Sequence, residues 1–394
     1  MNYFLNKPAH WMNDDRLPFL ICFLLMALPY CLYQDSILFP LIRTISIPSH
    51  LFFCIFYFVL IFSALRFGGI FAQSFLWRQQ RRSPGSDDGG IVYFILFSLV
   101  LLSIVTHVYQ VLVAGAGYAS GGFVGAREEF SAAGIGILLR LNLIALPGLC
   151  FLEPKVSRLK KLFIVVGVLT VMRAFLMSER MALLEYALIV FVALRIRGVV
   201  PKNKVVFGSL FVMAIFFSLI QLLRFLFQSA IDRNLAETGS EGVLNLFMIY
   251  YADTINKFYQ LFFFDIEYPY TTWSAFFRAL SYGKDSLREY RFFEEIAYIN
   301  PYWIGALNNP GGLAQDYSDF GLFGGLLSVF IKFSFAAFIF KVGVRSLYLS
   351  PLVVILLIGI VEFPRFNYLY APFAFVLFFL ALSLVAICLL FRRV

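Results

Sequence analysis

Charged residues are scarce in this sequence. They make up 14% of the 394 residues, where an average soluble domain has about a quarter, and 61% of the residues are hydrophobic. No stretch of soluble composition is long enough to form a separate soluble domain. The 49 phenylalanines and 21 tyrosines are too many for a single core to bury. The composition therefore predicts a protein whose side chains face lipid as well as one another.

Residues that bind metals or carry out redox chemistry are also few. The five cysteines lie in or beside apolar runs, and no two of them have the spacing of a metal-binding or redox motif. Of the three histidines, only His107 falls inside an expected span. The first outer loop has a single acidic residue, Asp35, and so lacks the paired carboxylates of a metal-dependent transferase. We expect no metal and no cofactor.

A basic arm or face, which nucleic-acid binding needs, is missing although the net charge is +9. The basic residues form short clusters between apolar runs, as orientation in a membrane requires. The glycine-rich stretch 115–122 follows an apolar span and not a β-strand, so it does not predict a nucleotide site. The first sixteen residues are polar and lack the layout of a signal peptide. The expected surroundings are membrane lipids, and no nucleic acid.

Apolar runs of membrane-crossing length recur along the chain. A helix needs about 20 apolar residues to cross the hydrocarbon core. Ten runs come close to this length, at 17–33, 51–71, 91–113, 134–152, 162–177, 181–193, 205–227, 320–340, 352–366 and 368–390. The predicted fold class is therefore all-α, a polytopic integral membrane protein with about ten transmembrane helices.

The basic residues orient these ten spans. Every second connection carries a cluster of lysines or arginines, and the chain ends on Arg392 and Arg393. The alternate short connections carry one basic residue each, namely Arg43, Arg127, Arg180 and Arg365. Basic connections face the cytoplasm under the positive-inside rule. Both termini are therefore expected on the cytoplasmic side.

Three regions follow from this arrangement. Residues 1–227 are expected to form an N-terminal bundle of seven spans, residues 228–318 a large outer loop, and residues 319–394 three C-terminal spans. Residues 243–265 are long enough to cross, but a crossing would place the C-terminal arginines outside. We therefore expect an amphipathic helix there, lying on or dipping into the outer face.

Basic residues inside expected spans are informative, because each one costs about 3 kcal/mol near the bilayer centre unless it has a partner. Arg66 and Lys332 can snorkel to the inner face. A further set lies near the outer ends of spans, namely Arg127, Arg140, Arg173, Arg180 and Arg224. The planar guanidinium fork suits phosphate oxygens, so this layer predicts a pyrophosphate-binding site. Alternatively, each arginine pairs with a lipid phosphate or with a carboxylate such as Glu179 or Glu185.

The long outer loop supplies candidate sugar-binding residues. Aromatic rings stack on sugars, although tryptophan and tyrosine are also common at membrane interfaces. The candidates for glycan binding are Tyr270, Trp273, Arg278, Arg288, Arg291, Trp303 and Asn309. Asp316 and Asp319 lie at the outer mouth of the next span, where one carboxylate could accept a proton from an attacking hydroxyl. The alternative there is an N-cap by Ser318 or Asp319.

Two patches carry a resemblance to a known family. The first is Ser178-Glu-Arg180-Met-Ala-Leu-Leu-Glu, and the second is Asn308-Asn-Pro-Gly-Gly-Leu-Ala-Gln-Asp316-Tyr-Ser-Asp319-Phe-Gly321-Leu-Phe-Gly324. They are similar to the Ser-x-Arg turn and the Tyr-x-Asp-Phe-Gly-x-x-Gly segment of Wzy-type O-antigen and oligosaccharide repeat-unit polymerases. The layout resembles that family too, with many spans and a large outer loop late in the chain. The arginine–ten residues–glycine motif of some members is absent, so no loop arginine is carried over.

The resemblance implies a glycosyltransferase with GT-C-like architecture in the bacterial inner membrane. Such enzymes transfer a growing glycan from one undecaprenyl pyrophosphate carrier to an incoming lipid-linked repeat unit, on the periplasmic face. Arginines would bind the pyrophosphates without a metal. Asp316, Asp319 or Glu295 would activate the acceptor hydroxyl. The implied partners are the lipid-linked donor and acceptor and a protein that regulates chain length.

Three other functions stay open. An O-antigen ligase shares the donor, but its family has a histidine in the large outer loop, and no histidine follows His107 here. A transporter or flippase for lipid-linked sugars predicts charges along a path through the whole membrane and repeated halves, and we find no internal repeat. A membrane scaffold would use the arginines only to anchor lipid headgroups.

Overall fold

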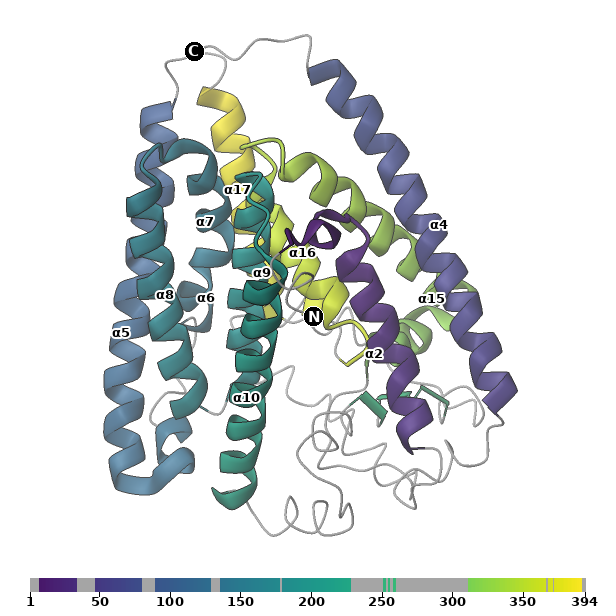
Figure 1. The fold of residues 1–394 in the computed structure, drawn as a ribbon, viewed down its shortest axis with the longest axis horizontal. Coiled ribbons are helices and arrows are strands. Elements are labelled where there is room, and N and C mark those ends of the chain that lie inside the picture. The colour runs from purple at the N-terminus through teal and green to yellow at the C-terminus, as the bar shows by residue number, and fades with distance from the viewer. Residues whose placement is uncertain are drawn as a thin grey trace.

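The protein is described here from a computed structural model. The structure describes residues 7–33, 47–79, 89–128, 135–177, 179–227, 251–252, 254–255, 258–259, 311–365, 368–370 and 372–391. Within these ranges the chain is almost entirely helical, and its only β pairing is an isolated bridge between Pro8 and Lys202. The predicted all-α character is confirmed for this part of the chain (Figure 1).

The helices follow one another along the chain with short connections in its N-terminal part. They are η1 (His10–Asn13), α2 (Leu17–Tyr33), α4 (Ile47–Gln79), α5 (Gly89–Glu128), α6 (Ile135–Leu139), α7 (Leu141–Leu152), α8 (Val156–Leu176), α9 (Arg180–Ile196), α10 (Asn203–Phe227), α15 (Gly311–Gly343), α16 (Ser350–Val361), η3 (Tyr368–Tyr370) and α17 (Pro372–Phe391).

Several helices have the length and composition of membrane spans. In the described part of the chain, four stretches are long and apolar enough to cross a membrane: Ser49–Leu76, Gly90–Ala119, Ile135–Leu152 and Asp319–Gly343. Large apolar side chains on them face outward, and Phe94 and Phe323 are 70% and 85% exposed. Apolar surface of this extent is unfavourable in water and favourable in lipid. These helices indicate a protein embedded in a membrane.

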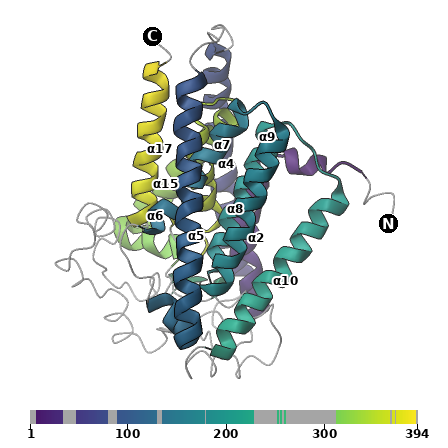
Figure 2. The same cartoon turned by 90° about the vertical axis from the view of Figure 1, so that its left-hand side faces the viewer.

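Helix α10 shows the same outward apolar character. Figure 2 shows α10 inclined away from α9 over its first half. Val205, Phe207, Leu210 and Phe211 of this half are all exposed. A helix that is apolar on its exposed sides is suited to lipid contact.

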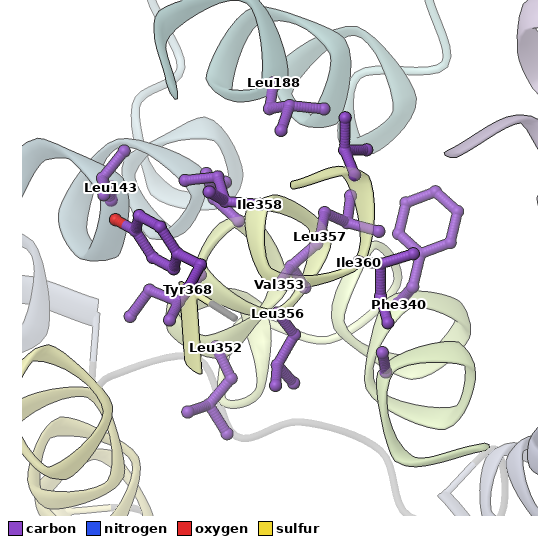
Figure 3. Packing of buried hydrophobic residues seen from close by; sticks show 14 of the residues in the cluster. Leu143, Leu188, Phe340, Leu352, Val353, Leu356, Leu357, Ile358, Ile360 and Tyr368 are labelled. Atoms are coloured by element: carbon purple, nitrogen blue, oxygen red, sulfur yellow. The ribbon is translucent and has the colours of Figure 1, made fainter. Parts of the chain in front are cut away.

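Helix α16 forms the centre of the bundle. All twelve of its residues are buried, and it packs against α2, α7, α9, α15 and α17. Figure 3 shows its side chains directed to several sides, toward Leu143, Leu188, Phe340 and Tyr368 of the surrounding elements. A helix that is apolar all round has no face for water, so it is placed in the core. At 1.5 Å per residue it is only about 18 Å long, shorter than the hydrocarbon thickness.

The observed helices differ from the predicted spans mainly at their ends. Helix α2 coincides with the predicted span 17–33, but α5 runs on to Glu128, well past the predicted end at residue 113. The connection expected between the spans 91–113 and 134–152 is therefore helical as far as Glu128. Glycine costs about 1 kcal/mol relative to alanine within a helix, which weakens the helix without ending it. The predicted span 134–152 is divided at Arg140 into α6 and α7.

Helix α15 departs furthest from the sequence expectation. It begins at Gly311, inside the predicted outer loop 228–318, and is interrupted at Gly321, where φ is 65° and ψ is −172°. Glycine adopts this conformation without a Cβ penalty. At the interruption, residues 311–320 fold back along the rest of the helix. The closeness of the two segments is seen at Gly325, where an added Cβ would lie 3.1 Å from the carbonyl oxygen of Asp316. The amide of Gly312 also donates to the carbonyl of Phe363 over 2.8 Å.

The predicted amphipathic helix 243–265 is described only at 251–252, 254–255 and 258–259. These six residues are helical and all buried. Their spacing places them on one face of a helix. That face packs on the bundle, since the Phe258 ring lies 5.2 Å from Phe53 and the Tyr259 hydroxyl lies 2.8 Å from Nδ1 of His50. The rest of 243–265 lies outside the described residues.

Candidate functional site

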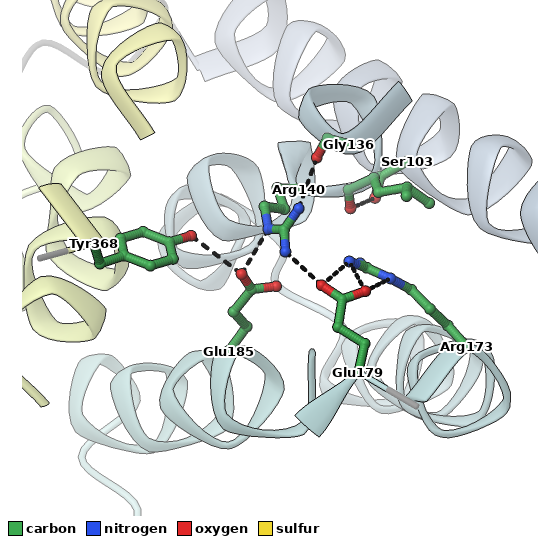
Figure 4. Close-up of polar contacts among 8 residues, drawn as sticks. Ser103, Gly136, Arg140, Arg173, Glu179, Glu185 and Tyr368 are labelled. Atoms are coloured by element: carbon green, nitrogen blue, oxygen red, sulfur yellow. Dashed lines mark hydrogen bonds and ion pairs between the residues drawn. The ribbon is translucent and has the colours of Figure 1, made fainter. Parts of the chain in front are cut away.

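Arg140 occupies the junction between α6 and α7 and is the centre of a buried polar network. Its backbone leaves the helical region there, with φ −93° and ψ 5°. The guanidinium Nε donates to Glu185 Oε1 over 2.6 Å, and Nη2 donates to Glu179 Oε1 over 2.7 Å. Nη1 donates to the carbonyl of Gly136 over 3.2 Å (Figure 4). All three guanidinium nitrogens therefore have acceptors.

Arg173 reaches the same network from the last turn of α8. Its Nε donates to Glu179 Oε2 over 2.9 Å, and its Nη2 lies 2.6 Å from Oε1 and 2.5 Å from Oε2 of the same carboxylate. Glu179 lies on the connection between α8 and α9, in an extended conformation with φ −104° and ψ 90°. One carboxylate is therefore shared by two guanidinium groups.

Glu185 and Tyr368 complete the network on the other side of Arg140. Glu185 projects from α9 and accepts from Arg140 and from the Tyr368 hydroxyl, which lies 3.1 Å from Oε1. The Arg140 guanidinium also lies 4.5 Å from the ring centre of Phe373, a cation–π contact. We call Arg140, Arg173, Glu179 and Glu185 the arginine–glutamate cluster. Its two positive and two negative side chains balance.

The structure describes the side chains of two of the five arginines in the predicted layer, Arg140 and Arg173. The structure brings Arg140 and Arg173 together, and it pairs both with carboxylates, which is the alternative that the sequence left open. The backbones of the other three candidates lie in α5 (Arg127), α9 (Arg180) and α10 (Arg224). Their side chains lie outside the described part, so pyrophosphate binding by the layer stays a prediction.

A second buried ion pair lies within α15. Lys332 Nζ is 2.5 Å from Asp316 Oδ1, and the two side chains are 12% and 1% exposed. The pair forms because the interruption at Gly321 returns Asp316 to the middle of the helix that carries Lys332. The expectation that Lys332 snorkels to the inner face is therefore wrong. A buried ammonium group needs a partner, and the Asp316 carboxylate supplies one without the lysine extending past apolar side chains to the membrane surface.

The two predicted catalytic aspartates are both buried. Asp316 is 1% exposed and Asp319 is 4% exposed. Both Ser318 and Asp319 precede the interruption at Gly321, after which the second part of α15 begins, so the alternative of a helix cap there stays a prediction. The segment between α16 and α17 contacts both charged sites. Phe363 lies 5.7 Å from Lys332 Nζ, and Tyr368 bonds Glu185 in the arginine–glutamate cluster.

Several participants in these sites were not predicted. Tyr368 was expected only as the first residue of the span 368–390. Lys332 was not expected to meet Asp316. His107, in contrast, was expected to be a packed or hydrogen-bonded residue of its span. This is confirmed, because it is buried and its Nδ1 lies 2.8 Å from the carbonyl oxygen of Ser103. No pattern in the sequence links Tyr368 to Glu185, which lies 183 positions earlier in the chain.

The remaining candidates lie outside the described residues. These are Glu295 and the candidate glycan-binding residues Tyr270, Trp273, Arg278, Arg288, Arg291, Trp303 and Asn309. Among the residues that are described, no group of three or more histidine, cysteine, aspartate or glutamate side chains could hold a metal ion.

Comparisons with known proteins gave no further information on these sites. No protein-family model matches the chain. No curated protein matches it. No solved structure matches it either.

Proposed function

We propose that this chain is a Wzy-type oligosaccharide repeat-unit polymerase. It would lie in the bacterial inner membrane with about ten spans, both termini in the cytoplasm and GT-C-like architecture. The proposal rests on the sequence resemblance, and one observation supports it most. Glu179, the middle residue of the Ser-Glu-Arg turn, lies between the guanidinium groups of Arg140 and Arg173. The turn that carries the resemblance is therefore part of a buried arginine site.

The second patch of the resemblance also coincides with a charged site. It contains Asp316, which pairs with Lys332, and Gly321, whose conformation allows that pairing. Ionisable side chains inside membrane proteins are costly and usually have a function. In the proposed reaction, a carboxylate takes the proton of the acceptor hydroxyl as that hydroxyl attacks the anomeric carbon. The bond to the pyrophosphate breaks, and arginines stabilise the charge that develops on the leaving group.

A second candidate function is a transporter or flippase for lipid-linked sugars. The observation that favours it is the buried Asp316–Lys332 pair, because ion pairs within the membrane also line the pathways of transporters. The polymerase is preferred because the two sequence patches point to it together.

The surface-glycan length profile distinguishes these functions. A strain that lacks the protein is compared on a gel with the same strain after its restoration. A polymerase predicts that the deletion leaves lipid A–core with a single repeat and that the ladder returns on restoration. Loss of all repeats with accumulation of lipid-linked chains identifies the ligase. An unchanged ladder contradicts both for that glycan.

A site variant tests the role of the arginines in the same assay. Arg173→Lys keeps the positive charge but loses the planar fork that binds two oxygens at once. We expect shorter chains than with the wild type at equal protein level, measured by immunoblot of the membrane fraction. Arg16→Lys is the matched control, because the Arg16 side chain is 60% exposed and its ion pair is with the nearby Asp14. Full-length chains with Arg173→Lys contradict a pyrophosphate-binding role for Arg173.

A further inference from the structure

The four charged side chains of the arginine–glutamate cluster differ in their exposure. The side chain of Arg173 is 3% exposed, that of Glu185 5% and that of Arg140 9%, whereas Glu179 is 26% exposed. Glu179 is therefore the only member that a molecule outside the bundle can reach directly. The other three side chains are buried.

Glu179 is also the member that can leave with the least change to the fold. Its own backbone is extended directly before α9, and it makes no side-chain hydrogen bond to cap that helix. Its carboxylate bonds are to the two arginines. Glu185 differs, because it projects from within α9 and is bonded by both Arg140 and Tyr368.

The position of the Glu179 carboxylate is one that a phosphate group can take. Two guanidinium groups converge on its oxygens with N–O distances of 2.5 to 2.9 Å. Guanidinium forks bind carboxylates and phosphates through the same pairs of parallel hydrogen bonds. A phosphate also has more oxygens to share between two such forks than a carboxylate has.

We propose that Glu179 is a displaceable internal anion: its carboxylate occupies a phosphate-binding position, and a phosphate-bearing ligand takes its place between Arg140 and Arg173. Arg140 stays bonded to Glu185 throughout. With Glu179 in place the four charges sum to zero, and without it the remaining three sum to +1, which complements an anion. The identity of the ligand as a lipid-linked pyrophosphate rests on the proposed function.

The displacement explains how two buried arginines can stay in the protein before a ligand arrives. A buried charge without a partner is strongly unfavourable, and Glu179 supplies that partner in the empty site. The ligand then competes with the protein's own carboxylate, so its apparent affinity is lowered by the fraction of molecules in which Glu179 still occupies the position.

The test compares two variants that change the charge of the cluster equally. Purified full-length wild type, Glu179→Gln and Glu185→Gln are placed in bilayer discs of phosphatidylcholine and titrated with undecaprenyl pyrophosphate. If Glu179 occupies the site in at least nine molecules of ten, Glu179→Gln tightens binding by about tenfold or more. Glu185→Gln adds the same charge but removes no competitor, so it gives no comparable gain. Equal tightening by both variants, or none by Glu179→Gln, overturns the inference.

Two further arms keep the result interpretable. Glu179→Asp retains the charge but shortens the side chain, so its affinity is expected between those of the wild type and Glu179→Gln. An affinity at or below that of the wild type for both Glu179 variants, with normal elution on size exclusion, contradicts displacement.

Inorganic pyrophosphate and discs containing phosphatidylglycerol separate the sources of phosphate. A gain for Glu179→Gln with undecaprenyl pyrophosphate or inorganic pyrophosphate supports the inference. A gain with phosphatidylglycerol alone overturns the pyrophosphate identity and assigns the position to a lipid headgroup. The glycan ladder is scored separately, so failure of the proposed polymerase activity is distinguishable from failure of displacement.

Discussion

The protein holds charge inside its helical bundle in two different ways. The arginine–glutamate cluster joins α6–α7, α8 and α9, and Tyr368 links it to the segment before α17. The Asp316–Lys332 pair joins two parts of the single helix α15. The first has one partly exposed member, and the second has none above 12% exposure. In this protein, the site assembled from several elements is accessible at Glu179, whereas the pair within α15 is buried on both sides.

The largest expected effect comes from removing the centre of the open site. Arg140→Leu leaves the Glu185 and Glu179 carboxylates without their shared partner, and Glu185 is buried. We expect the free energy of unfolding to fall by about 3–5 kcal/mol, the range for breaking a buried ion pair. Titration of the purified protein with sodium dodecyl sulfate measures it. Arg173→Leu deprives only Glu179, which can turn outward, and is expected to cost less. Equal losses of stability for Arg140→Leu and Arg173→Leu would contradict the idea that the exposed Glu179 tolerates loss of a partner better than the buried Glu185 does.

The closed pair is tested by a double-mutant cycle. Lys332→Met removes the ammonium group that lies against the buried Asp316 carboxylate, and we expect a loss of about 3 kcal/mol. Asp316→Asn together with Lys332→Met removes both charges and is expected to recover most of that loss, which gives a large coupling energy. The same denaturant titration measures four proteins: the wild type, Lys332→Met, Asp316→Asn and the double variant. Additive effects of the two substitutions would show that the pair contributes nothing as a pair.

The smallest expected effect concerns the conformation that brings the pair together. Gly321→Ala puts a Cβ at a residue with φ 65°, where no other atom lies within 4 Å, so the penalty comes from the backbone alone. Because ψ is −172°, this conformation is essentially restricted to glycine, and we expect a loss of about 1–3 kcal/mol. Gly208→Ala in α10 is the matched control, since that site is also open but helical, and it should gain about 0.5–1 kcal/mol. If Gly208→Ala lowered the free energy of unfolding and Gly321→Ala did not, a special backbone requirement at Gly321 would be contradicted.

Much of the helical fold was predictable from composition alone. Helix α2 and the C-terminal end of α7 lie where the apolar runs placed them, because runs of apolar residues have few alternatives to a buried or lipid-facing helix. The ends of α5 and the start of α15 were not predictable in the same way. Hydropathy marks the segment that fits the hydrocarbon core, but it does not mark the ends of the helix. A helix can continue beyond the hydrocarbon core wherever its backbone hydrogen bonds are maintained.

The candidate site was predictable only as a set of residues. The sequence placed Arg140 and Arg173 at one level and named Glu179 and Glu185 as alternative partners. It gave no reason to connect Tyr368 with Glu185, 183 residues away, or Asp316 with Lys332. The first contact depends on how α9 and the segment before α17 pack, and the second on a single backbone conformation at Gly321.

The amino-acid sequence by itself determined that this chain forms apolar helices, that few charges enter them, and that several of those charges are arginines. Length and hydropathy decide these features locally, residue by residue. Only the tertiary structure decided which charges meet. An ion pair in a low-dielectric interior requires partners within a few ångströms, and the packing of α6, α7, α8 and α9 and the fold-back of α15 bring them that close.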